Sequence, residues 1–154
     1  FKDTNIILQG GVDDVWFNTK TKELLIVDYK SQASTKEVSQ DTYFPKGGFH
    51  DSYKTQLNFY AYLMKGMKLE DEIKYEISRD SYLYVVNGMD VKEGFNGKIK
   101  FSETLIYHKI ETDYLDNEIQ NMFDAINSDK IPEANKSCKN CAYARQRSKT
   151  DTFI

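Results

Sequence analysis

Two aspartates and a lysine near the start of this 154-residue chain stand where charge is costly. Asp13 precedes one apolar and aromatic stretch, and Asp28 and Lys30 follow another, the apolar run of residues 24–27. A continuous run of this kind is typical of a strand buried on both faces. Carboxylates placed there need a compensating cation, and their oxygens suit Mg²⁺ or Mn²⁺. The residues therefore predict a divalent metal site with a lysine that reaches a metal-bound water or a substrate phosphate.

A hairpin is expected to bring the two aspartates together. Residues 12–18 and 23–30 are rich in β-branched and aromatic side chains, and a short polar connection separates them. A symmetric register places Asp13 directly opposite Asp28, where Cβ atoms lie about 4.5–5.5 Å apart and like charges destabilise each other. A cation reverses that effect, and without one the pair titrates jointly with at least one raised pKa. The strand period also puts Lys30 on the face of Asp28. A structural salt bridge of Lys30 with a neighbouring acid is the simpler alternative.

A helix is expected to supply a third side of the site. Asp51 or Ser52 is a candidate N-cap, and Gly66 lies near the predicted end. Gln56 and Tyr60 are one turn apart on one face, and a glutamine beside an apolar stripe needs hydrogen-bond partners. An ordinary core helix with Gln56 at its border is the alternative. The apolar stripe itself consists of Tyr53, Leu57, Tyr60, Met64 and Met67.

Three motifs in this order resemble those of the PD-(D/E)XK nuclease superfamily: Gly10-x-x-Asp13, Asp28-Tyr29-Lys30 and Gln56-x-x-x-Tyr60. The likeness is strongest to the RecB-like branch, which includes RecB and AddB nuclease domains and CRISPR-adaptation exonucleases, and it covers roughly residues 6–145. It implies an α/β restriction-endonuclease-like fold, with a central mixed β-sheet flanked by helices. It also implies metal-dependent hydrolysis of DNA phosphodiester bonds, in DNA repair, recombination or phage- or CRISPR-related processing.

The resemblance also implies roles for individual residues. Asp13 and Asp28 would ligate Mg²⁺ or Mn²⁺ together with the backbone carbonyl of Tyr29, and Lys30 would be the catalytic lysine. Gln56 and Tyr60 would support the site and contact the DNA backbone.

Asp14 competes with Asp13 for the first position, because Gly11 to Asp14 has the same spacing. The hairpin register and the flanking Val12 and Val15 favour Asp13.

Two features depart from the family's pattern. Many members carry a histidine or acid on a helix upstream of the first motif. This chain begins at Phe1 without an initiating methionine, so we expect a fragment of a longer protein.

Several RecB-like nucleases also hold an iron–sulfur cluster on four cysteines, whereas this chain has only Cys138 and Cys141. Such clusters need four ligands, so we interpret the pair as free thiols or a cluster remnant, and expect an intact cluster only in a full-length parent. The spacing of His50 and His108 does not support a zinc site.

Length and composition indicate one globular domain over residues 1–154, with residues 134–154 as a basic C-terminal segment. Between residues 134 and 150 there are five basic residues and no acid, in a chain of net charge −3. This segment either contacts phosphates or is a solvated tail. There is no apolar run long enough to span a membrane and no signal-peptide pattern, so we expect a cytoplasmic, intracellular protein. Its expected partners are DNA and a larger parent protein or partner subunit.

The remaining elements are assigned from periodicity and turn residues. Residues 5–9, 81–87 and 98–110 are predicted strands, residues 31–50 a polar loop, and residues 89–95 have no clear pattern. A second helix is predicted over residues 113–127, and its inner face consists of Leu115, Ile119, Met122, Phe123 and Ile126.

Three functions are compatible with the sequence. The first is a Mg²⁺- or Mn²⁺-dependent deoxyribonuclease, either an exonuclease or an endonuclease. The second is a catalytically inactive or partner-dependent nuclease-like DNA-binding module, which the missing upstream helix and incomplete cysteine set suggest. The third is a structural or interaction α/β domain with accidental motifs. It would place the carboxylates of Asp13 and Asp28 more than about 8 Å apart, since Mg²⁺ ligands lie at about 2.0–2.1 Å.

Overall fold

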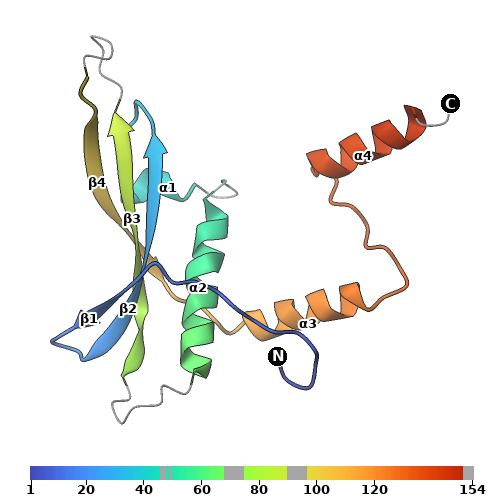
Figure 1. Ribbon diagram of the computed structural model, residues 1–154, viewed down its shortest axis with the longest axis horizontal. Helices are drawn as coiled ribbons and strands as arrows, with labels where there is room; N and C mark the ends of the chain where they lie inside the picture. The colour runs from blue at the N-terminus through green and yellow to red at the C-terminus, as the bar shows by residue number, and fades with distance from the viewer. Residues whose placement is uncertain (46–47, 49, 68–74, 90–96, 151–154) are drawn as a thin grey trace. The chain divides into compact units, whose positions relative to one another are not determined.

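The computed structural model describes residues 1–45, 48, 50–67, 75–89 and 97–150. Within them, a four-stranded sheet and its helices follow one another along the chain (Figure 1). The elements are β1 (Asp14–Asn18), β2 (Glu23–Ala33), α1 (Gln40–Tyr43), α2 (Asp51–Gly66), β3 (Glu76–Met89), β4 (Lys100–Lys109), α3 (Leu115–Ile126) and α4 (Lys139–Thr150).

The sheet is mixed and has the strand order β1-β2-β3-β4. The outer pairs β1·β2 and β3·β4 are antiparallel, whereas β2 and β3 run parallel with α2 in the connection between them. Parallel neighbours require such a crossover. This arrangement confirms the expected α/β fold with a mixed central sheet and flanking helices.

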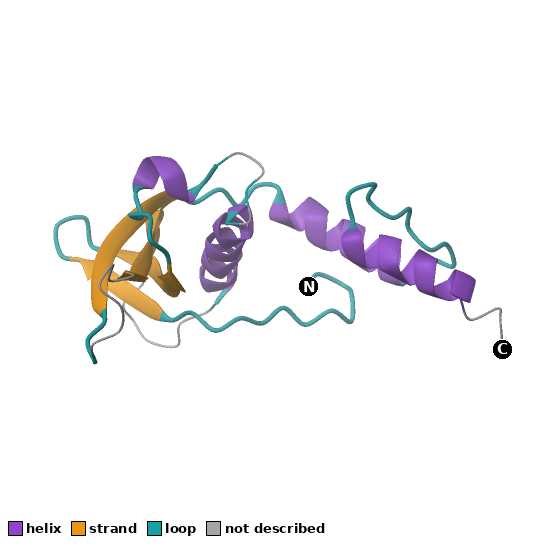
Figure 2. Cartoon of the chain, turned by 90° about the horizontal axis from the view of Figure 1, so that it is seen from above, coloured by secondary structure: helices purple, strands orange, loops and turns teal. Residues whose placement is uncertain are grey.

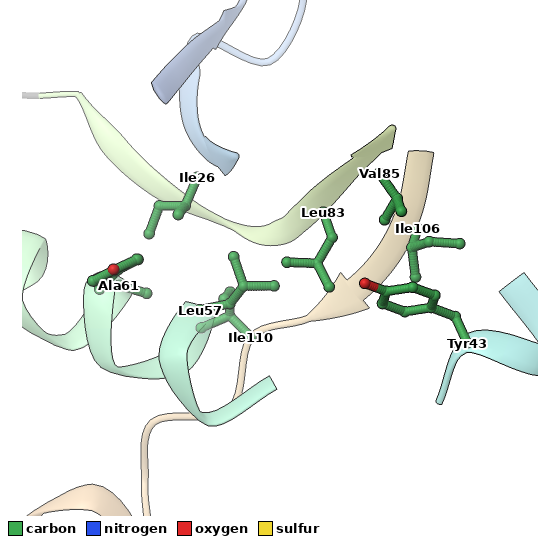
Figure 3. Close-up of a cluster of buried hydrophobic side chains, with 9 residues drawn as sticks. Ile26, Tyr43, Leu57, Ala61, Leu83, Val85, Ile106 and Ile110 are labelled. Atoms are coloured by element: carbon green, nitrogen blue, oxygen red, sulfur yellow. The ribbon is translucent and has the colours of Figure 1, made fainter. Parts of the chain in front are cut away.

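Helix α2 covers one face of the sheet (Figure 2). Leu57 and Ala61 of this helix are fully buried against inward-facing strand residues, among them Ile26 and Leu83 (Figure 3). Burying an aliphatic side chain of this size contributes about 1.5–3 kcal/mol. The packing therefore holds the Gln56–Tyr60 turn of the helix against the strand that carries Asp28 and Lys30.

The β1–β2 hairpin has the predicted register. Asn18 pairs with Glu23 and Asp14 with Val27, so Asp13 precedes the first pair at the level of Asp28. The side chain of Asn18 closes the turn by accepting hydrogen bonds from the backbone of Lys20 and Thr21. Strand β1 begins at Asp14, two residues later than predicted.

Other boundaries differ from the prediction. Residues 5–9, predicted as a strand, form none. The predicted loop over residues 31–50 is wrong in two parts. Residues 31–33 extend β2, because this strand stays paired with β3 as far as Gly88. Residues 40–43 form α1. His50 is the N-cap of α2 in place of Asp51 or Ser52, and its side chain makes no capping hydrogen bond to the helix. Part of the unassigned stretch, residues 90–95, lies outside the described residues.

The chain divides into two compact units, Phe1–Leu115 and Asp116–Ile154. The first contains the sheet, α1 and α2, and the second contains most of α3 and all of α4. In α3, Leu115 and Ile119 are buried, but Met122 and Ile126 are 59% and 77% exposed, so their predicted place on an inner face is wrong. Among the described residues, no helix is both long and apolar enough to cross a membrane.

Candidate active site

Asp13 and Asp28 meet where β1 begins. Asp28 is 1% exposed on the helix-covered face of β2, and Asp13 is exposed at the rim. The backbone N–H of Tyr29 donates to Oδ2 of Asp13 at 2.9 Å, which holds that carboxylate beside the strand. The two carboxyls are close enough for a hydrogen bond when one is protonated. The structure thus brings together the two acids that the hairpin register paired.

Asp28 is an acid in an environment that disfavours its charge. Burial is the main cause of its raised pKa, and the charge of Asp13 raises the pKa further. Lys30 acts in the opposite direction through a hydrogen bond and its charge. Oδ2 of Asp28 is fully buried, and the ammonium of Lys30 is its ion-pair partner.

Lys30 is held by three neighbours. Its ammonium group pairs with Asp28, donates to Oε1 of Gln56 at 3.0 Å, and lies 4.5 Å from the centroid of the Tyr53 ring. The Lys30 side chain is 18% exposed. Carboxylate, amide and ring face together fix the position of its ammonium group.

Gln56 and Tyr60 act as one hydrogen-bonded pair on α2. An ammonium group only donates, so Oε1 of Gln56 must face Lys30 and Nε2 must point away. Nε2 donates to the hydroxyl of Tyr60 at 2.7 Å, and Tyr60 is buried. Gln56 therefore contacts Lys30 from the helix side, and Tyr60 holds Gln56. Support of a catalytic site and contact with DNA by these two residues stay predictions.

Gly10 packs against Tyr60 and Leu63 of α2. A Cβ at Gly10 would lie 3.0 Å from Cε1 of Tyr60 and 3.2 Å from Cδ1 of Leu63, closer than most real contacts. At Gly11 a Cβ would meet nothing within 4 Å. The first glycine of the motif thus permits close approach of the segment before β1 to α2.

Asp14 lies on the opposite face of the hairpin from Asp13. Its Oδ2 accepts from Nε1 of Trp16 at 2.9 Å and from the hydroxyl of Tyr29 at 2.7 Å. Both hydrogen bonds lower the pKa of Asp14, and the one from Tyr29 has the larger effect. Its carboxylate is therefore engaged away from Asp28 and Lys30, and this geometry favours Asp13 over Asp14 as the site acid.

An aromatic stack beside the site was missed in the sequence. His50 stacks on Tyr43, with ring centroids 4.2 Å apart, and on Tyr53, with centroids 5.4 Å apart. Burial, followed by the charges of Tyr53 and Asp28, raises the pKa of Tyr43 to about 12, so its phenol stays neutral at working pH. The sequence feature that could have indicated this stack is the recurrence of aromatic residues along residues 43–53. The contact between the rings depends on α1, however, and the sequence did not predict that helix.

Each cysteine and histidine side chain contacts another group of the protein. The Sγ atoms of Cys138 and Cys141 lie 2.9 Å apart, within hydrogen-bond distance, and both thiols are free. Hydrogen bonds from Cys141 lower the pKa of Cys138. His108 contacts Oδ1 of Asn58 at 2.8 Å, and Nδ1 of His50 contacts the carbonyl of Tyr43. No group of three histidine, cysteine or acidic side chains that could hold a metal occurs among the residues described.

Comparison with known proteins gives the family. A family model described as the PD-(D/E)XK nuclease superfamily matches residues 1–146. No curated protein and no solved structure matches the chain. Because the model spans nearly the whole chain, this protein belongs to the PD-(D/E)XK nuclease superfamily, whose members are typically nucleases and generally use divalent metals such as Mg²⁺.

The residues present fit such a metal. Asp28 is buried with Lys30 as its cationic partner, and Asp13 lies at the same level at the exposed rim. Mg²⁺ is usually held by one or two carboxylates, with waters and substrate phosphate as its other ligands. Two opposed carboxylates therefore suffice for this kind of site, without the larger ligand cage that zinc or calcium requires.

Proposed function

We propose that this protein is a metal-dependent deoxyribonuclease of the RecB-like branch, which hydrolyses DNA phosphodiester bonds in repair, recombination or phage- or CRISPR-related processing. One observation carries the proposal: Lys30 is anchored on the carboxylate of Asp28, which lies opposite Asp13. A structural salt bridge would account for Lys30 and Asp28 but not for a second acid at the same level. Asp13, Asp28 and the carbonyl of Tyr29 would hold Mg²⁺ or Mn²⁺.

The bound ion would polarise a phosphate oxygen and lower the pKa of the attacking water. Lys30 provides a fixed positive charge beside the two acids, where negative charge develops on the phosphate oxygens. Its contacts with Gln56 and the Tyr53 ring keep the ammonium in place before substrate arrives. Preorganised donors of this kind act without reorganising during the reaction.

Replacement of Lys30 tests this role. We expect Lys30→Ala to lower cleavage at least about 100-fold, the usual loss for one preorganised donor. The assay uses linear and circular DNA, single- and double-stranded, with Mg²⁺ or Mn²⁺. Lys20→Ala is the matched control, because Lys20 is exposed in the β1–β2 turn away from the site. Circular dichroism checks that both variants fold.

Equal cleavage by the two lysine variants would remove Lys30 from the mechanism. DNA binding without cleavage by the wild-type protein at any Mg²⁺ or Mn²⁺ concentration would instead favour an inactive or partner-dependent binding module. Cleavage by the isolated wild-type chain rules out both that module and a purely structural domain.

A further inference from the structure

A pocket beside the candidate active site has chemistry that the proposed mechanism does not use. Its volume is about 340 Å³, and its lining residues come from the end of β2, from α1 and from the start of α2. Gln32 and Ser34 line it from the strand end, Thr42 and Tyr43 from α1, and His50 from the start of α2. Pockets that hold small organic groups span about 300–1,000 Å³, so this one is the size for a single group.

The pocket lies one side-chain position along β2 from Lys30. Gln32 lines the pocket and follows Lys30 on the same face of β2, two residues or about 6.6 Å further along the strand. His50 also lines the pocket and stacks on the Tyr53 ring that faces the ammonium of Lys30. The pocket is therefore within reach of a base whose phosphate contacts Lys30.

The lining suits a nucleobase better than a phosphate. Val38, Tyr43 and His50 contribute apolar atoms to the lining, although the ring faces of His50 are already stacked on Tyr43 and Tyr53. The amide of Gln32 and the hydroxyl of Thr42 offer both donors and acceptors for a base edge. Unpaired bases are recognised through hydrogen bonds to their exposed edges together with apolar contacts.

The charges of the lining balance each other. Lys36 and Glu37 are the ionised side chains that line the pocket, and they carry opposite signs. A phosphate subsite would need an excess of positive charge, and a metal site would need more than one carboxylate. A neutral ligand fits this balance.

A buried amide keeps the pocket formed. Asn87 of β3 is fully buried, and its Nδ2 donates to the carbonyls of Ser34 and Lys36 at 3.2 and 3.3 Å. Its Oδ1 accepts from Nε2 of Gln32 at 3.4 Å. The backbone around the pocket is therefore fixed by the sheet without a ligand.

We propose that this pocket is a subsite for one unpaired nucleobase of the strand that is cut, next to the scissile phosphate. The inference rests on the proposed nuclease function and specifies its substrate class. A base paired within a duplex cannot enter a cavity of this size, so the substrate is single-stranded DNA or a frayed end. An intact blunt duplex does not use the pocket.

Two neighbouring positions on α1 provide a matched test. Thr42 lines the pocket and Asp41 does not, although both side chains are exposed. Binding of fluorescent single-stranded oligothymidylate is measured by anisotropy in EDTA, so cleavage does not interfere. Thr42→Trp fills the pocket and is expected to weaken binding at least about ten-fold, as for loss of the contacts of one base. Asp41→Trp should bind like the wild type, and all three proteins should bind a blunt duplex equally.

The outcomes separate the subsite from the nuclease. Equal oligothymidylate affinity of Thr42→Trp and Asp41→Trp overturns the subsite, as does the absence of binding to the wild-type protein. Selective loss in Thr42→Trp supports the subsite even if the wild type cuts no DNA in Mg²⁺ or Mn²⁺, which would contradict the proposed nuclease alone. A circular dichroism spectrum of each variant shows that the fold is kept.

Discussion

At the scale of single residues, the site depends on a carboxylate that the fold buries at a cost. Asp28 is 1% exposed, and burial raises its pKa. Lys30 compensates in part, since its ammonium contacts the buried oxygen. A buried charge with incomplete pairing destabilises the folded state, so this residue is explained better by chemistry than by stability.

Because the pKa of Asp28 is raised, we expect that replacing this residue with a neutral one stabilises the protein by an amount that depends on pH. Between the usual carboxyl pKa of about 3.9 and the raised value, the folded state binds more protons than the unfolded state. Wild-type stability therefore falls as pH rises through this window. In EDTA, Asp28→Asn should be more stable than the wild type at pH 7, by about 1.4 kcal/mol for each unit by which the folded state raises the pKa of Asp28. Denaturant unfolding at several pH values should show the difference narrowing toward about pH 4. A variant less stable than the wild type at pH 7 would contradict this account.

The sequence was informative about these acids because a hairpin is local. The symmetric pairing of β1 and β2 alone places Asp13 opposite Asp28, and the structure has that register. The separation of Asp13 from Asp14 follows from the same alternation of strand faces. The partners of Lys30 were harder to predict, because its contact with Tyr53 depends on how α2 packs on the sheet.

At the scale of elements, the segment before β1 must approach α2 closely. We expect Gly10→Ala to destabilise the protein by about 1 kcal/mol or more, since the added methyl group overpacks the contact with Tyr60 and Leu63. Cleavage should fall as well, because Tyr60 orients Gln56. Gly11→Ala is the matched control, with open space around its Cβ. It should be neutral or gain about 0.4–1 kcal/mol through the unfolded state.

Urea unfolding and cleavage rates of the two glycine variants check this expectation. If Gly10→Ala matched Gly11→Ala in both measurements, the close approach to Tyr60 would have no consequence for the site.

Long, periodic elements were predictable and short or unpatterned ones were not. The spacing of apolar residues located α2 to within a turn, because one face of it is buried. Helix α1 has four residues, too few to show a period. The extension of β2 to Ala33 reflects pairing with the distant β3, which no local pattern contains.

At the scale of the whole molecule, we expect the basic C-terminal segment to contribute to DNA affinity without base selectivity. Helix α4 carries basic side chains and no acid along residues 139–150, in a chain that is acidic overall. Lys139→Gln with Arg145→Gln should weaken binding to all DNA sequences. The same change should reduce the slope of log Kd against log salt by up to about 0.9 for each phosphate that the variant no longer neutralises. Titrations over a range of salt concentrations measure this slope.

Lys20→Gln is the control for nonspecific loss of charge, because Lys20 lies exposed in the β1–β2 turn. An unchanged salt slope in the double variant would identify the segment as a solvated tail that does not touch phosphates.

The most direct test of the central claim compares two adjacent aspartates, of which the geometry assigns only one to the site. Asp13 faces Asp28, whereas Asp14 is bonded to Trp16 and Tyr29 on the opposite face. Cleavage of linear single-stranded DNA in Mn²⁺ is measured for the wild type, Asp13→Asn and Asp14→Asn. We predict a loss of at least about 100-fold for Asp13→Asn and near wild-type cleavage for Asp14→Asn. Full activity of Asp13→Asn, or no metal-dependent cleavage by the wild-type protein, would contradict the claim.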